Sequence, residues 1–194
     1  SLWLDMAGKT EENTTSRDVA VTPRGLGSGV ASISTGGEIV CAVASGEVRC
    51  WSWRELTDDL DLSYSWKPAL VPTAVPGLPA GLKTVSVAHY AWQPTTEDRG
   101  LQQTGWACAT GDGQAWCWGD NHAGQLGDGT TADRREPVQV TAGDVAQLTV
   151  NWGTALALLR DGSVVTWGDG DPATRSPFGF ALAPAQPAGT GFRE

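Results

Sequence analysis

The sequence predicts an all-β protein made of propeller-type blades, each with four short antiparallel strands. The main observation is a hairpin pattern that occurs three times. It reads VCAVASGEVRCWSW at 40–53, ACATGDGQAWCWGD at 107–120 and ALALLRDGSVVTWGD at 155–169. The chain of 194 residues also holds 25 Gly and 11 Pro, which suit many tight turns better than long helices. The chain is therefore a repeat protein.

The spacing of the units supports the same architecture. The tryptophans at 3, 51, 118 and 167 are 48, 67 and 49 residues apart, and periods of about 40 to 50 residues with several strands are typical of propellers. An alternating apolar segment precedes each hairpin (30–34, 85–88, 145–150), and a further short strand precedes that segment (18–21, 69–75, 136–140). We therefore expect units at 3–50, 51–117 with insertions 54–69 and 91–105, and 118–166, followed by a partial unit at 167–194. The pattern starts and stops inside a unit, which predicts an open or partial propeller with about three complete blades and partial blades at both ends.

Turn residues set the register of the hairpins. Ser45-Gly46 and Asp112-Gly113 each predict a two-residue turn, because both positions of such a turn need positive φ and Asp-Gly is among the strongest signals for it. In the third hairpin we expect Ala157 to face Thr166.

The register brings the four cysteines together in two pairs. Cys41 is predicted opposite Cys50, and Cys108 opposite Cys117, at non-hydrogen-bonded sites where Cα atoms are about 4.5 Å apart. This distance allows a disulfide, and we predict one in each hairpin. Four reduced, buried cysteines in a cytosolic protein remain an alternative. The C-x8-C spacing does not match the ligand spacing of a zinc knuckle.

Eight of the ten tryptophans fall into two groups. Those that close the repeated hairpins are predicted to pack between blades, whereas Trp66, Trp92, Trp106 and Trp152 lie outside that register and are candidates for a surface. The insertions 54–69 and 91–105 are either binding loops or merely tolerated loops. The candidate partner-binding residues are Tyr64, Trp66, Tyr90, Trp92, Trp106 and Trp152.

A known family carries the same motif. The segment WCWGDNHAGQLGDGTTADRREPVQV at 116–140 resembles the repeat of the regulator of chromosome condensation family, with matches at Trp118, Gly119, Asn121, Gly124, Gln125, Leu126, Gly127 and Gly129. The resemblance implies a seven-bladed propeller fold, and the cysteine pair in the hairpin resembles exported bacterial members. The eukaryotic namesake is a nucleotide exchange factor that touches nucleosomes, and we do not expect either activity in this acidic chain. A similar secreted propeller inhibits β-lactamases through loops and aromatic side chains on one face.

The sequence offers little for catalysis or metal binding. No nucleophile elbow, phosphate loop or HExxH motif is found, and neither His89 nor His122 has the spacing of a metal pair or a catalytic triad. The acidic stretches at 57–61 and 119–133 lack the order of ligands that an EF-hand calcium loop requires. We therefore predict no catalytic residue, no cofactor and no metal.

Charge and cysteine usage suggest where the protein acts. A net charge of -9 argues against nucleic-acid binding, and no segment has the apolar length of a membrane span. Bridged cysteines favour a secreted or extracellular protein whose leader has been removed, with the bacterial cell surface or periplasm as alternatives. 

Three functional readings follow from these features. The first is a non-catalytic structural subunit that completes its blades by self-assembly or within a larger complex. The second is a secreted inhibitor or receptor-like module that docks an enzyme or a cell-surface partner through its inserted loops. The third, a propeller lyase or hydrolase, would need a pocket with a general acid and base that the sequence does not supply. The first reading is our prediction.

Overall fold

The computed structural model describes residues 3–4, 10–11, 22–52, 71–92, 102–168 and 181–185, and for 3–4, 10–11, 90–92, 102–104, 181–182 and 185 it describes the backbone alone. Within these residues every regular element is a strand, and three four-stranded antiparallel sheets account for nearly all of them. The predicted all-β fold is confirmed. No helix in the described ranges is long and apolar enough to cross a membrane.

Each sheet is one blade, formed by four strands in chain order. Blade 1 contains β3 (Val30–Gly36), β4 (Ile39–Ala44), β5 (Glu47–Ser52) and β6 (Thr73–Ala74). Blade 2 contains β7 (Thr84–Trp92), β8 (Gln102–Gly111), β9 (Gln114–Gly119) and β10 (Arg134–Val140). Blade 3 contains β11 (Val145–Asn151), β12 (Thr154–Leu159), β13 (Val164–Gly168) and β14 (Ala181–Ala185).

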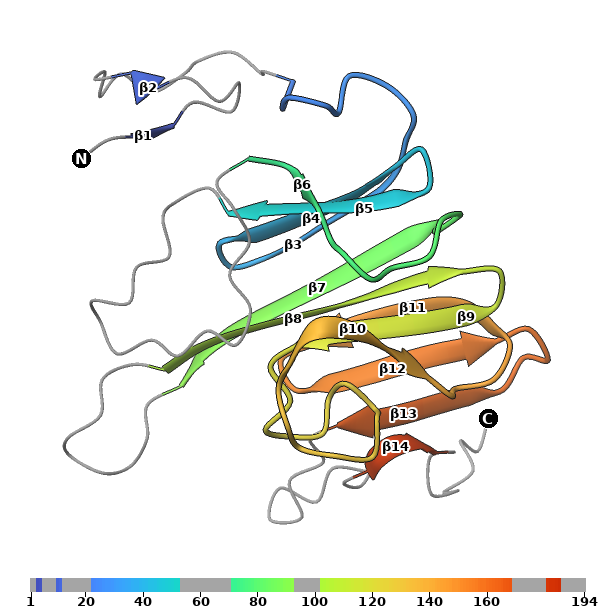
Figure 1. The fold of residues 1–194 in the computed structure, drawn as a ribbon. Coiled ribbons are helices and arrows are strands. Elements are labelled where there is room, and N and C mark those ends of the chain that lie inside the picture. Colours follow the sequence, from blue (N-terminus) through green and yellow to red (C-terminus); the bar gives the residue numbers. More distant parts are fainter. Residues whose placement is uncertain are drawn as a thin grey trace, which may run out of the picture.

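The blades are stacked face to face in chain order and do not close into a ring (Figure 1). A small ribbon of β1 (Trp3–Leu4) and β2 (Thr10–Glu11) lies beyond blade 1. The hairpin turns between the second and third strands of every blade lie on one side of the stack. The turns between the first and second strands lie on the other side, which we call the loop side (Figure 1). 

Two hairpins have the predicted register. Ser45 and Gly46 have φ values of 52° and 81°, and Asp112 and Gly113 have 50° and 82°, as a tight turn with two left-handed residues requires. Cys41 lies opposite Cys50 and Cys108 opposite Cys117, with 4.1 Å between the Cα atoms of each pair. The structure joins each pair in a disulfide, with S–S distances of 2.09 and 2.06 Å.

The register of the third hairpin differs from the prediction by one residue. Ala157 faces Val165 rather than Thr166, and Thr166 faces Leu156. The reason is a longer turn between β12 and β13. The amide of Leu159 donates to the carbonyl of Ser163 at 2.8 Å, which leaves a three-residue loop where two residues were expected.

The fourth strand of each blade follows the hairpin of that blade in the chain, whereas the predicted units placed it before the hairpin. We expected the strands at 69–75 and 136–140 to belong with the hairpins that follow them. Instead β6 pairs with β5 and β10 pairs with β9, so each completes the blade before it. β14 completes blade 3 in the same way. The expected strand at 18–21 lies outside the described residues.

The hydrophobic core consists of two layers, one between each pair of neighbouring blades. Because side chains alternate across a strand, blade 2 contributes to both layers. Cys41–Cys50 lies in the layer between blades 1 and 2, and Cys108–Cys117 in the layer between blades 2 and 3. Each disulfide therefore faces the blade that follows it. The closing tryptophans Trp51, Trp118 and Trp167 are all buried, as predicted.

Candidate interaction surfaces

The described strands next to the predicted binding segments end on the loop side of the stack (Figure 1). The strands that flank residues 53–70 and 93–101 end there, beside the turn between β11 and β12 (Figure 1). Of the six candidate residues, Tyr64 and Trp66 lie outside the described residues. Tyr90 and Trp92 lie at the loop-side end of β7, where only the backbone is described.

Trp106 is a correction to the prediction. It is fully buried between blades 2 and 3, so it cannot contact a partner. Its indole Nε1–H donates to the carbonyl oxygen of Trp152 at 2.7 Å. A tryptophan that does not close a hairpin was predicted to lie on the surface. Blade 2, however, has a neighbouring blade on each side, so side chains on both of its faces are covered.

Trp152 is exposed and firmly held. Its side chain keeps 71% of its accessible surface, and its backbone has a φ of 24°, which is rare for a residue other than glycine. It lies in the turn between β11 and β12, where Asn151 pairs with Thr154. The hydrogen bond from the buried Trp106 fixes the turn from inside. Trp152 is therefore a large apolar side chain presented to solvent from a constrained backbone.

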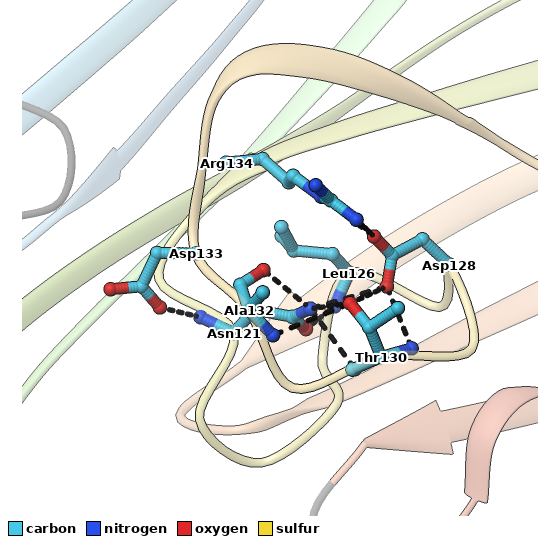
Figure 2. Close-up of polar contacts among 7 residues, drawn as sticks. All are labelled: Asn121, Leu126, Asp128, Thr130, Ala132, Asp133 and Arg134. Carbon is cyan, nitrogen blue, oxygen red and sulfur yellow. Dashed lines mark hydrogen bonds and ion pairs between the residues drawn. The ribbon is translucent and has the colours of Figure 1, made fainter.

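The connection between β9 and β10 is built around the buried side chain of Asn121 (Figure 2). Its Nδ2 group donates to the carbonyl oxygens of Thr130 and Ala132 at 3.1 and 3.0 Å, and to Asp128 Oδ1 at 3.2 Å. Its Oδ1 accepts the amide of Leu126 at 2.9 Å. One side chain thus supplies hydrogen-bond partners to backbone groups of a loop that lies outside the strand ladders.

Asp128 strengthens the same loop. Its Oδ1 accepts the amide and the hydroxyl of Thr130 at 2.9 and 2.7 Å, and its Oδ2 accepts from Arg134 Nε at 2.8 Å. Burial opposes ionisation of this carboxyl, but the bonds from Thr130 and Arg134 outweigh it and lower its pKa below the usual 3.8. Asp133 Oδ1 accepts the amide of Asn121, yet partial burial and the nearby charge of Asp120 raise the pKa of Asp133.

The connection also ties blade 2 to blade 3. The carbonyl of Gln125 accepts the indole N–H of Trp167 at 2.9 Å, and Gln125 Nε2 donates to Asp120 Oδ2 at 2.8 Å. His122 Nδ1 lies 2.6 Å from the same carboxylate oxygen, and its ring is partly exposed. The polar groups of this connection are thus used to hold the loop and to join two blades.

The outward faces of the two end blades carry exposed apolar side chains. On blade 1, Ile33 keeps 74% of its accessible surface, and Val30 is also exposed. On blade 3, Leu158 and Val164 are exposed and face each other across β12 and β13. With Trp152, they are the exposed large hydrophobic residues of the described ranges.

A stack of four-stranded antiparallel sheets, each formed by consecutive strands and packed face to face, defines a β-propeller blade array. Residues 112–150, which run from the β8–β9 turn through most of β11, match the regulator of chromosome condensation (RCC1) repeat. This part of the chain is thus similar to an RCC1 repeat.

Relatives share this repeat over parts of the chain. The E3 ubiquitin-protein ligase HERC2, in mouse and in human, is 36% identical over 101 residues, which are 50% of this chain and 2% of the relative. The ultraviolet-B receptor UVR8 of Arabidopsis thaliana is 39% identical over 64 residues, 31% of this chain and 14% of that protein. The chain thus spans a small part of these relatives, whose names give different activities.

The fold is also similar to that of solved structures. Prp20p from Saccharomyces cerevisiae, which is described as binding Gsp1p and histones, is 16% identical and superposes with a TM-score of 0.57. The similar region covers 81% of this chain and 36% of Prp20p. Human WBSCR16 gives the same TM-score at 19% identity, covering 81% of this chain and 37% of that protein. These similarities define the fold as that of a propeller.

Proposed function

We propose that this chain is an exported, non-catalytic blade array that acts in protein–protein association. In this role it is a structural subunit whose end blades associate with a further blade, supplied by another copy or by a larger complex. The RCC1-type repeat fits protein association in general. The buried polar side chains described above serve the loop and the blade contacts, which favours a structural role over catalysis.

The exposed apolar faces of the end blades carry this proposal. Val85 in blade 2 and Leu148 in blade 3 occupy the position that Ile33 occupies in blade 1. Each of the three directly precedes the residue of its strand that lies opposite Cys41, Cys108 or, in blade 3, Leu156. Val85 and Leu148 each keep 6% of their accessible surface, against 74% for Ile33. A face that neighbouring blades cover elsewhere is open here, and open apolar faces favour association.

The disulfides support export. Cys41–Cys50 and Cys108–Cys117 lie buried between blades, and disulfides form and persist mainly in oxidising compartments. We expect the native protein to hold both bonds in the extracellular space or the periplasm.

Light scattering and sedimentation across a concentration series test the proposal. We expect the mass to rise above that of one chain as concentration increases. Because the chain carries a charge of -9, repulsion between copies opposes association, and added salt should strengthen it. A mass equal to one chain at every concentration and salt level would overturn self-assembly.

A second candidate function rests on Trp152. Large aromatic side chains on a constrained backbone are common energetic centres of interfaces, because little entropy is lost when they are immobilised. In this hypothesis, the loop side docks an enzyme or a cell-surface partner through Trp152 and through the predicted binding segments 54–69 and 91–105. Capture experiments would compare the native chain with Trp152→Ala and, as a matched control, Gln139→Ala on the exposed part of β10. A partner that binds Trp152→Ala as well as the native chain would exclude this site.

A further inference from the structure

Each disulfide is covered by the blade that follows it. Cys41, Cys108 and Cys117 have no accessible surface, and Cys50 keeps 2%. Thiol–disulfide exchange needs direct contact, because a thiolate attacks a sulfur atom and passes through a mixed disulfide. The packed chain therefore gives an oxidant or a reductant no access to either bond. 

Blade 2 covers the first bond. The Cys41–Cys50 bond shares one core layer with Val87 of β7 and Ala107 of β8. Beside it, Ser34 lies opposite Cys41, and the Ser34 Oγ accepts the amide of Val87 at 3.0 Å. Apolar packing and a polar contact thus hold blade 2 over this disulfide.

Blade 3 covers the second bond in the same way. The Cys108–Cys117 bond shares its core layer with Val150 of β11 and Ala155 of β12. Ser86 lies opposite Cys108, and the Ser86 Oγ accepts the amide of Val150 at 3.1 Å. The two bonds thus lie in the layers on either side of blade 2, and different residues cover each of them.

The two cysteines of a pair meet without help from any other blade. Nine positions separate them in the sequence, and the turns at 45–46 and 112–113, with positive φ at both positions, close each hairpin locally. Hairpins form within about 1–10 µs. The covering strands come later in the chain, because β7 begins at Thr84 and β11 at Val145. Each pair of cysteines can thus meet before its cover is in place.

We infer that each disulfide forms in the exposed hairpin and that packing of the following blade then controls all access to it. In the forming step, one cysteine thiolate attacks a small disulfide oxidant and releases one thiol. The second cysteine thiolate attacks the resulting mixed disulfide, releases the other thiol and closes the bond, so two electrons and two protons pass to the oxidant. Reduction is the reverse and needs the blade to move away. This control operates within a single copy, so it does not depend on the proposed self-assembly.

Reduction of the native chain by dithiothreitol is the first test. The fraction of each bond that is reduced over time is measured by alkylation and mass spectrometry, without denaturant and, for comparison, in urea. Because only molecules with the covering blade opened can react, we expect each bond to be reduced at least about a hundredfold more slowly without urea. Equal rates in the two conditions would overturn the inference.

Two matched variants then test which blade covers which bond. Val87→Ala weakens the packing of blade 2 on blade 1, and Val150→Ala weakens that of blade 3 on blade 2, at equivalent positions of β7 and β11. We expect Val87→Ala to raise the reduction rate of Cys41–Cys50 roughly tenfold and Val150→Ala that of Cys108–Cys117, with the other bond changing less than about twofold. Gln147→Ala, at an exposed position of β11, should change neither rate. If each variant speeds the reduction of both bonds equally, the whole chain opens at once, and control by the following blade is wrong.

Refolding tests the order of events. The reduced chain is refolded with oxidised glutathione present from the start, or with the oxidant added after refolding. We expect both bonds to form at least about a hundredfold more slowly in the second case. A reduced chain that folds only when the oxidant is supplied supports the same order, because packing then follows bond formation. Slow bond formation in both cases would mean that packing comes first, and fast formation in a reduced chain whose near-UV circular dichroism is already native would mean that the blades do not control access; either result refutes the inference.

Discussion

Replacing Asn121 should test whether a single buried amide holds the connection between β9 and β10. In Asn121→Ala the amide of Leu126, whose residue is fully buried, loses its acceptor. A buried N–H left unpaired costs about 1–3 kcal/mol. The carbonyls of Thr130 and Ala132 lose a donor too. Because these residues are not buried, water can take the place of the donor, and the loss of these two bonds costs roughly 1 kcal/mol more.

The total is about 2–4 kcal/mol of unfolding free energy. For a chain of this size, each kcal/mol shifts the melting temperature by roughly 2–4 °C, so we expect a drop of roughly 4–16 °C. Calorimetry and urea unfolding of the native chain and of Asn121→Ala would measure it. Thr131→Ala, at an exposed position of the same loop, is the matched control.

A second variant separates the hydrogen bond that the Asn121 side-chain oxygen accepts from those that its amide nitrogen donates. Asn121→Asp keeps an oxygen for the Leu126 amide but turns a carboxylate oxygen toward Asp128 and two carbonyls. It should destabilise the protein strongly at neutral pH and less below about pH 4, where carboxylates become protonated. If Asn121→Ala melts within about 2 °C of the control, the loop does not depend on this residue, and the reasoning is refuted.

Three further predictions concern stability. Replacing Cys41 and Cys108 by Ser should remove both disulfides and lower the free energy of unfolding by about 2–3 kcal/mol for each bond, without changing the fold. If reductant leaves the melting temperature of the native protein unchanged, the two disulfides are refuted. Gly119→Ala should destabilise the chain, because Gly119 has a φ of 106° and its new Cβ would meet the backbone of β8; an unaltered urea midpoint would contradict this. The pKa of Asp128 is lowered by folding, so its stabilising contribution is complete above its unfolded value near 3.8 and is lost as pH falls through the folded value. The gap in melting temperature between the native chain and Asp128→Asn should therefore shrink below about pH 4, and a constant gap would argue against the assignment.

Local chemistry explains why parts of the fold could be predicted. The turn residues at 45–46 and 112–113 need positive φ at both positions, and this fixes the register of the strands on either side. The third hairpin escaped the same logic because its turn has one more residue, closed between Leu159 and Ser163. A difference of one residue in the loop is enough to change which side chains face each other.

The candidate surface was predicted less well, for a different reason. Trp106 and Trp152 looked alike in the sequence, since both lie outside the closing register. The structure buries Trp106 between two blades and exposes Trp152, whose carbonyl accepts the hydrogen bond of Trp106. Whether a strand face is covered depends on a blade more than forty residues away, and no local pattern reports it.

The sequence by itself determined the blade architecture, the register of two hairpins, the pairing of the cysteines and the burial of the closing tryptophans. These follow from turn chemistry and from alternation along a strand, which act over a few residues. Only the tertiary structure decided that β6, β10 and β14 complete the blades before them, that serine hydroxyls join one blade to the next, and that the carbonyl of Gln125 receives the indole of Trp167. These features need groups that are far apart in the chain to meet, and their partners are chosen by the packing of whole sheets rather than by neighbouring residues.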